Sequence, residues 1–141
     1  IGLDLSGSYL KEASRYISDL DGDLIELIKG NAEQLPFNDK SIQGISCVYL
    51  FHELPRTIRE KVLKEFFRVL EPDGTLILAD SIQETDSPDF IQIMENFHKS
   101  FHEPFYSDYI KEDINSKMEE IGFSSIKSNS FFMTKVWSAI R

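Results

Sequence analysis

The sequence has one cysteine, no long apolar run and few basic residues, and each shortage excludes a class of protein. A single cysteine, Cys47, cannot form a disulfide within the chain, so a disulfide-stapled secreted domain is excluded and a cytoplasmic location is expected. No apolar segment approaches the roughly 20 residues of a membrane-spanning helix. The 15 basic against 24 acidic residues give a net charge of -9, which argues against nucleic acid as a partner.

The chain has the size and composition of one globular domain. Its 141 residues, 41% of them hydrophobic and 28% charged, suffice for one core, and they carry no repeat or low-complexity tract. We therefore predict a single domain over residues 1–141.

The clearest local pattern lies between residues 42 and 80. Residues 45–51 form an apolar run rich in β-formers, which predicts a buried strand that ends before Pro55. Thr57 and Glu60 have the spacing of a capping box and predict the start of a helix. The apolar positions of that helix are Ile58, Val62, Leu63, Phe66, Phe67 and Leu70.

The helix is followed by turn residues and a second apolar strand. Pro72-Asp73-Gly74 predicts a tight turn, residues 75–79 predict a strand covered on both faces, and Asp80 closes it. Strand, helix and strand together predict a right-handed parallel crossover.

The flanking regions continue this alternation. Residues 1–6 resemble the end of a strand, and Ser6 or Ser8 can cap a helix with apolar positions from Tyr9 to Ile17. Residues 24–28 predict a second strand, which ends before Asn31. A chain that opens within a strand suggests that a preceding segment is missing.

The C-terminal third predicts two helices and a hairpin. Ser87-Pro88 favours a helix start, with the helix running to about Lys99, and another helix from about Asp108 should end at Gly122. Residues 124–140 predict two strands split near 128–130, which must run antiparallel because their link is short.

These elements predict an α/β fold: a doubly wound, mostly parallel, Rossmann-like sheet with helices on both faces and a C-terminal antiparallel hairpin. Ligands of such sheets bind beyond the carboxyl ends of the strands. The polar residues predicted at these ends are Asp4, Asn31, His52, Glu53 and Asp80.

Several segments resemble the class I methyltransferases that use S-adenosylmethionine, especially the small-molecule branch of ubiquinone and menaquinone biosynthesis. Residues 2–6 with Tyr9-Leu10 resemble the motif of the family's second strand, and residues 30–37 resemble its adenine loop, with Asn31 where Asp is usual. The strand before residue 51, the segment 67–74 and the strand at Thr75 resemble the fourth and fifth strands. The match covers most of the chain in the expected order.

The resemblance implies S-adenosylmethionine as cofactor and assigns residues to it. Asp4 should accept hydrogen bonds from both ribose hydroxyls, because an ionised carboxylate can do so. Asn31 should accept the adenine amine, and Tyr9 should pack against the adenine ring. Ala32 and Tyr49 complete the implied cofactor contacts.

The acceptor side is assigned more coarsely. His52, Glu53 and His102 are the candidate catalytic residues, and Phe101, His102 and Tyr106 are expected to cover a small, hydrophobic acceptor. No metal site is expected. Among the three histidines, only the i, i+4 pair of His98 and His102 has a spacing typical of metal ligands, and this pair alone gives little support for a site. Cys47 is read as a packing residue.

One departure from the family is large. Its first strand and glycine-rich G-x-G-x-G loop have no counterpart, so the resemblance implies a domain truncated at its N-terminus. We expect this chain alone to be inactive and to self-associate through unpaired sheet edges, as a homo-oligomer. Two alternatives remain: a non-catalytic oligomerising module derived from this fold, and another doubly wound nucleotide-binding domain such as a dehydrogenase fragment.

Overall fold

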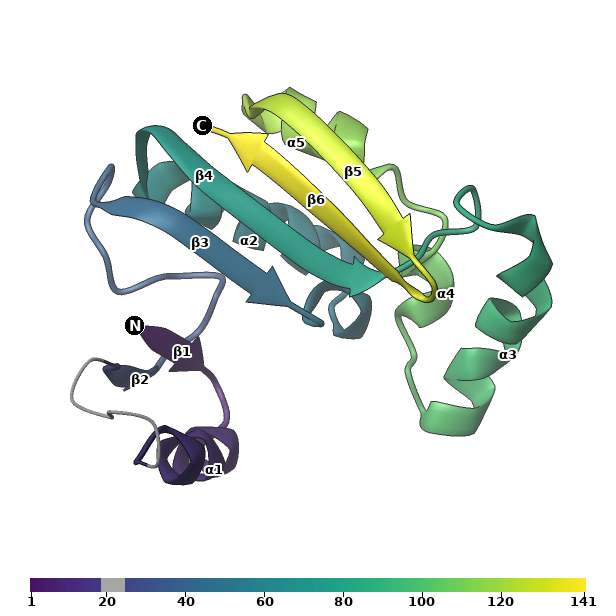
Figure 1. The fold of residues 1–141 in the computed structure, drawn as a ribbon, viewed down its shortest axis with the longest axis horizontal. Helices are drawn as coiled ribbons and strands as arrows, with labels where there is room; N and C mark the ends of the chain where they lie inside the picture. Colours follow the sequence, from purple (N-terminus) through teal and green to yellow (C-terminus); the bar gives the residue numbers. More distant parts are fainter. Residues whose placement is uncertain (19–24) are drawn as a thin grey trace. The chain divides into compact units, whose positions relative to one another are not determined.

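The computed structural model describes residues 1–18 and 25–141, except for the side chains of residues 98–101 (Figure 1). The chain divides into two compact units, Ile1–Phe37 and Asn38–Arg141. No described helix combines the length and apolar character that crossing a membrane requires.

The first unit contains a short parallel pair of strands and one helix, namely β1 (Gly2–Asp4), α1 (Gly7–Ser18) and β2 (Leu27–Lys29). Ser6 caps α1 as predicted, because its hydroxyl accepts the Tyr9 N–H at 3.3 Å and its carbonyl accepts the Leu10 N–H at 3.1 Å. The predicted second strand is shorter than expected and begins at Leu27, while Leu24 lies outside the described residues.

The second unit is built on a four-stranded mixed sheet in the order β3-β4-β6-β5 (Figure 1). β3 and β4 are parallel, whereas β6 runs antiparallel to both of its neighbours, so the predicted parallel crossover and C-terminal hairpin are confirmed. The strands are β3 (Ile42–Val48), β4 (Leu70–Ser81), β5 (Ser124–Phe131) and β6 (Thr134–Ile140).

The hairpin turn lies at Phe132 and Met133, and the predicted split near residues 128–130 is wrong. Phe131 pairs with Thr134, and Phe132 supplies the left-handed backbone that a tight turn needs, with a φ of 54°. The polar residues 128–130 lie within β5, which is an edge strand, so their side chains can stay half-buried or exposed without breaking the ladder.

The helix α2 (Arg56–Val69) links β3 to β4 and buries Val62, Leu63, Phe66 and Val69. The predicted capping box is absent, because α2 begins one residue before Thr57 and has Pro55 as N-cap without a side-chain bond. The Pro55 carbonyl instead accepts the N–H groups of Ile58 and Arg59, at 2.9 and 3.0 Å.

β4 starts at Leu70, directly after α2, and therefore contains the Pro72-Asp73-Gly74 segment that was predicted as a separate turn. The turn-forming residues produce a bulge in β4. Ile42 pairs with Leu70 and Gly44 with Thr75, so a step of two residues along β3 corresponds to a step of five along β4. Gly74 is needed there, because a Cβ on it would lie 2.8 Å from the Glu71 carbonyl oxygen.

The C-terminal half of the unit contains η3 (Pro88–Phe90), α3 (Ile91–Phe101), α4 (Tyr106–Tyr109) and α5 (Ile114–Ile121). The single helix predicted from Asp108 is wrong, because α4 ends at Tyr109 and Asp113 caps a new helix by accepting the Ser116 N–H at 3.0 Å. Gly122 ends α5 with a φ of 116°, as predicted. Ser87 makes no capping bond with its side chain.

The core of the second unit lies between the sheet and the helices α2 and α5, which cover one face of it (Figure 1). The Phe67 ring of α2 meets the Phe123 ring, which follows α5, edge to face at 5.1 Å. Fully buried apolar side chains of this core include Leu63, Leu70, Leu76, Leu78, Met118 and Trp137.

Candidate functional site

The candidate site of the second unit lies where the parallel strands β3 and β4 end. Val48 pairs in register with Ala79, so the carboxyl ends of both strands meet at one edge of the sheet. After β3 the chain forms a single 3-10 turn, η2 (Phe51–Glu53), beside the last residues of β4. Such an edge is where parallel α/β sheets bind ligands.

Asp80 is fully buried at this edge and organises it. Its Oδ2 accepts the Phe51 N–H at 2.7 Å, and its Oδ1 accepts the Ser81 N–H at 2.8 Å. Oδ1 also lies 2.7 Å from His52 Nδ1. One carboxylate therefore fixes both the backbone of η2 and the ring that η2 carries.

The His52 ring is held against Asp80 with 13% of its side chain exposed. Burial lowers the pKa of His52, whereas the hydrogen bond with Asp80 and the charge of that carboxylate raise it. The charges of Glu53 and Glu103 raise it further, so the pKa lies above its ordinary value. The surroundings of this ring thus favour positive charge.

Two tyrosines of α4 pack around the ring. The rings of Tyr106 and Tyr109 lie 6.0 and 6.3 Å from the His52 ring, both close to edge-on. The Tyr106 hydroxyl lies 2.6 Å from Ser81 Oγ, and the Tyr109 hydroxyl donates to the Ser81 carbonyl at 2.6 Å. Burial raises the pKa of both phenols, so at neutral pH they are uncharged hydrogen-bonding groups.

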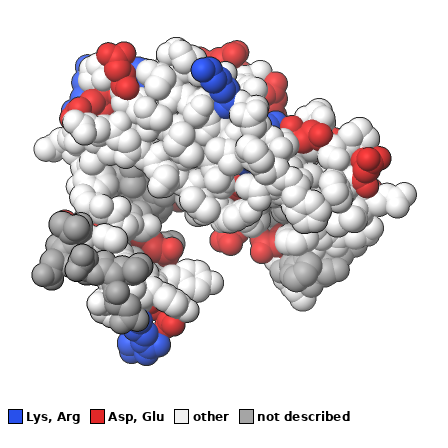
Figure 2. Space-filling model, in the orientation of Figure 1, with Lys and Arg blue, Asp and Glu red and all other residues white. Residues whose placement is uncertain are grey.

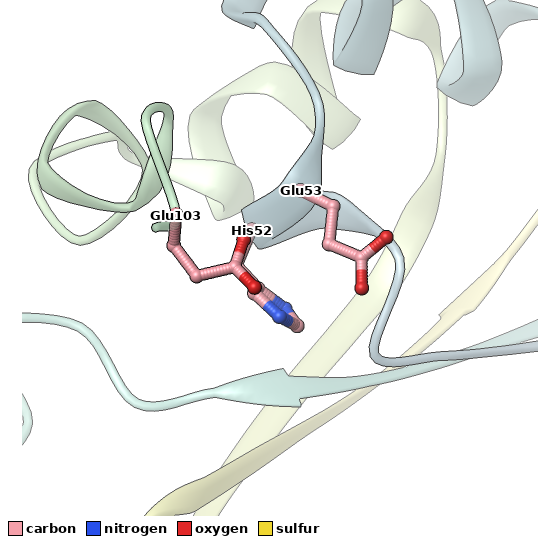
Figure 3. Close-up of side chains that lie close together, drawn as sticks. All are labelled: His52, Glu53 and Glu103. Atoms are coloured by element: carbon pink, nitrogen blue, oxygen red, sulfur yellow. The ribbon is translucent and has the colours of Figure 1, made fainter. Parts of the chain in front are cut away.

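Glu53 and Glu103 complete the cluster. Glu53 follows His52 in η2, and Glu103 reaches toward the His52 ring from the segment after α3 (Figure 3). The ligand atoms of these three side chains all lie within 4.8 Å of one another. We call His52, Glu53 and Glu103 the acidic cluster.

A buried arginine of α2 joins the elements that carry this site. The Arg59 side chain donates to the Leu54 carbonyl after η2 at 2.6 Å, to Asp108 in α4, and to Glu112 before α5 at 2.5 Å. Arg59 and the Glu112 side chain are 1% and 2% exposed. The turn η2 and the helix α4 are thereby held to the same guanidinium group.

The first unit carries the predicted ribose and adenine residues. Asp4 ends β1, and its Oδ1 accepts the Ser6 N–H at 2.6 Å, so the local role of a turn-forming acid is present. Asn31 follows β2, and its side-chain oxygen accepts the Glu33 N–H at 2.9 Å. Tyr9 lies on α1 with 71% exposure, and Ala32 is half-buried in the turn after Asn31.

Tyr49 lies at the carboxyl end of β3 in a left-handed conformation, with a φ of 51°. Its N–H donates to the Ala79 carbonyl at 2.8 Å, and its hydroxyl is hydrogen-bonded to Thr134 Oγ1. Its ring lies 6.2 Å from that of His52, so this predicted cofactor residue borders the acidic cluster.

The structure brings Tyr106 against His52, which stands beside Glu53 in η2, whereas His102 precedes Glu103 in the chain. His102 is exposed in the turn after α3, with a φ of 58°, and no contact with the acidic cluster is described for it. The Phe101 side chain lies outside the described residues. Cys47 is buried in β3, and burial raises the pKa of its thiol to about 12, in line with a packing role.

Three residues of the candidate site were not predicted from the sequence. Asp80 was predicted to end a strand but was not assigned to the site, although an acid that directly follows a buried strand indicates a candidate site residue. Tyr109 and Arg59 gave no such signal, because their hydrogen-bond partners Ser81, Asp108 and Glu112 lie 28 or more positions away along the chain.

A family model described as "Methyltransferase domain" matches residues 1–78, which is more than half of the chain. The demethylmenaquinone methyltransferase of Listeria monocytogenes serotype 4a is 37% identical over 82 residues, which are 58% of this chain and 34% of that protein. The enzyme of the same name from Oceanobacillus iheyensis is 32% identical over 85 residues, or 60% of this chain and 35% of that protein. The chain thus spans about a third of the length of these curated relatives.

Solved structures of methyltransferases share the fold. A SAM-dependent methyltransferase from Thermotoga maritima superposes with a TM-score of 0.73 at 21% identity, over 99% of this chain and 72% of that one. One from Aquifex aeolicus gives 0.62 at 18% identity, over 98% and 66% of the two chains. These likenesses confirm the Rossmann-like α/β fold, and the matched family model confirms the resemblance: the chain belongs to the class I S-adenosylmethionine-dependent methyltransferase family.

Proposed function

We propose that this chain forms the part of an S-adenosylmethionine-dependent methyltransferase that holds the donor's nucleoside and a small, mainly apolar acceptor. The observation that carries the proposal is the family match over residues 1–78, in which Asp4 stands at the end of the first strand. A carboxylate at that position can accept hydrogen bonds from two vicinal ribose hydroxyls.

The hydrogen bonds of Asp4 leave room for this role. Its Oδ1 is engaged by the Ser6 N–H, whereas Oδ2 has no hydrogen-bond partner among the described residues. Asp4 is half-buried, so a ligand can reach the free oxygen. The residues present therefore fit a ribose without rearrangement of the turn after β1.

The adenine contacts are proposed for Asn31, Ala32 and Tyr9. The Asn31 oxygen keeps one lone pair after accepting the Glu33 N–H, so it can still accept the adenine amine. The largely exposed Tyr9 ring offers a flat apolar face. Tyr49 also stays a proposed donor contact, as the resemblance implies.

The acceptor is proposed to lie against the aromatic side chains around the acidic cluster. Tyr106 packs against Phe97 with ring centroids 4.7 Å apart and against His52 at 6.0 Å, which gives an apolar wall with polar groups in it. This combination suits a small apolar molecule with one oxygen or nitrogen. These contacts support Tyr106 as a proposed part of the acceptor cover, and Phe101 and His102 stay predictions.

The chemistry asks mainly for orientation. The bound donor supplies a methyl group already activated on a positively charged sulfur. The protein must hold the acceptor atom in line with that methyl group and exclude water, and correct positioning can provide several kcal/mol of the barrier reduction. His52, locked by Asp80, is the side chain proposed to contact the reacting atom of the acceptor.

Calorimetric titration of the purified chain with S-adenosylmethionine tests the donor site. Asp4→Asn keeps an oxygen for the Ser6 N–H but loses the charge, so it isolates the ribose contact. Hydrogen bonds to a charged group contribute about 1.5–3 kcal/mol, so we expect Kd to rise at least tenfold.

Glu26→Gln removes an exposed acid of the same unit and should leave Kd unchanged. An Asp4→Asn variant that folds and binds the donor as tightly as the parent chain would contradict the assignment of Asp4. Titration with NAD separates this reading from the dehydrogenase alternative, because saturable binding of NAD but not of S-adenosylmethionine would favour the latter.

A further inference from the structure

The acidic cluster has a feature that the proposed acceptor site alone does not explain. Neither Glu53 nor Glu103 has a Lys or Arg partner within 4.0 Å among the described residues, although Glu112 and Asp108 nearby are both paired with Arg59. Two carboxylates therefore face one imidazole without a counter-charge. Acidic side chains also dominate the net charge of the chain, which is -9, and are spread over the face shown in Figure 2.

The second observation concerns the direction of the His52 ring. Asp80 is fully buried, and its two oxygens already accept the N–H groups of Phe51 and Ser81, so it acts as an acceptor toward His52 as well. Nδ1 of His52 consequently carries the hydrogen of the 2.7 Å bond, and the lone pair of the neutral ring lies on Nε2. A buried carboxylate that fixes a histidine through its other nitrogen is the usual outer shell of a metal-binding histidine.

We propose that the acidic cluster binds a divalent cation through His52 Nε2 and the carboxylates of Glu53 and Glu103. One nitrogen and two carboxylate groups suit Zn²⁺ better than Mg²⁺, which prefers oxygen ligands alone. The three side chains come from η2 and from the segment after α3, so the ion would also join these two elements (Figure 3).

The ligand atoms of the acidic cluster need to move only a short distance to surround an ion. Ligand atoms around a tetrahedral zinc ion with bonds of about 2.0–2.2 Å lie roughly 3.4 Å apart, and the ligand atoms of the three side chains now lie within 4.8 Å of one another. Each glutamate has three rotatable side-chain bonds, and Glu53 is exposed, so rotation of the carboxylates can supply the difference while His52 stays fixed by Asp80.

Three protein ligands would leave one position of the ion open. An oxygen or nitrogen of the acceptor could take it, so that His52 would act on that atom through the ion and not directly; the ion would orient the atom and favour loss of its proton. This use of the ion rests on the proposed function, whereas cation binding itself does not and is measured without donor or acceptor.

The experiment is calorimetric titration of the metal-free full chain with Zn²⁺ at pH 7, with parallel titration by Mg²⁺. We expect one saturable Zn²⁺ site, no comparable Mg²⁺ site, and affinity reduced at least tenfold in each of His52→Asn, Glu53→Gln and Glu103→Gln. Glu119→Gln, which removes an exposed acid of α5, should change the affinity less than twofold. Circular dichroism establishes that each variant is folded.

His102→Asn distinguishes the acidic cluster from the spaced pair of His98 and His102. Loss of Zn²⁺ binding in His102→Asn with retention in His52→Asn would overturn the proposal, as would the absence of saturable binding or equal affinity in all variants. Nitrogen NMR of the three histidines gives a readout on the unmodified chain: Zn²⁺ should shift Nε2 of His52 and leave its Nδ1 protonated. A shift of another histidine in place of His52 would also overturn it.

Discussion

Replacing Arg59 by leucine should destabilise the second unit, because it leaves a buried acid without its main partner. The Arg59 and Glu112 side chains are 1% and 2% exposed. Removing one partner of a buried ion pair costs about 3–5 kcal/mol. Arg56 Nε lies 3.2 Å from the other Glu112 oxygen and compensates in part, but its side chain is 58% exposed. We therefore expect a loss of about 3 kcal/mol in the free energy of unfolding.

Urea unfolding followed by the fluorescence of Trp137 measures this loss. Trp137 is the one tryptophan of the sequence and is fully buried in β6, so it reports on the second unit. The midpoint should fall with little change in slope. Arg68→Leu is the matched control in the same helix, since the ion pairs of Arg68 with Glu65 and Asp39 are more exposed and should contribute less than about 1 kcal/mol.

A double variant makes the reasoning refutable. Arg59→Leu with Glu112→Leu removes both buried charges, so it should be more stable than Arg59→Leu alone. A loss below about 1 kcal/mol in Arg59→Leu would show that the guanidinium is not needed to neutralise Glu112. A double variant no more stable than the single one would lead to the same conclusion.

Three further predictions concern other parts of the chain. Iodoacetamide should modify Cys47 only after unfolding, because a pKa of about 12 leaves roughly one thiol in ten thousand ionised at pH 8; rapid labelling of the folded chain would contradict this. Asp113→Ala should cost about 1 kcal/mol through loss of the helix cap. The hydrogen bonds from Ser116 lower the pKa of Asp113 in the folded chain. The loss of stability in Asp113→Ala should therefore have its full size above the pKa of the unfolded chain, near 3.8, and disappear as pH falls through the pKa of the folded chain. A loss of stability that persists in acid would exclude the carboxylate as its cause. β3 is an edge strand of its sheet, so light scattering should detect self-association, and Val48→Lys should weaken it; a monomer at all concentrations would refute that prediction.

The sequence predicted the elements whose signals are local. Gly122 ended a helix because few other residues adopt its conformation, and Ser6 capped a helix through its own neighbours. The carboxyl end of β4 followed from an apolar run that stops at Asp80, whereas β3 ends at Val48 and not at Phe51 as predicted, because Phe51 belongs to η2. For the same reason the candidate residues His52 and Asp80 were found at strand ends, although their mutual contact was not predicted.

The errors arose where a local signal had more than one structural outcome. Pro72-Asp73-Gly74 carries turn chemistry, but the pairing of Leu70 with Ile42 draws it into β4 as a bulge. The capping box predicted at Thr57 does not form, because the helix begins one residue earlier and the Pro55 carbonyl accepts the N–H groups of its first turn. The approach of Glu103 to His52 joins residues about fifty positions apart, and no spacing rule covers such a contact.

The order of strands in the second unit has a consequence for how it folds. β4 lies between β3 and β6 in its sheet. Its pairing with β6 joins residues far apart in the chain, since Thr75 pairs with Ile140 and Ser81 with Thr134. On a ribosome, residues 75–81 would therefore remain paired on one side only until residues 134–140 had emerged. Such long-range pairing slows folding and exposes an apolar strand in the meantime.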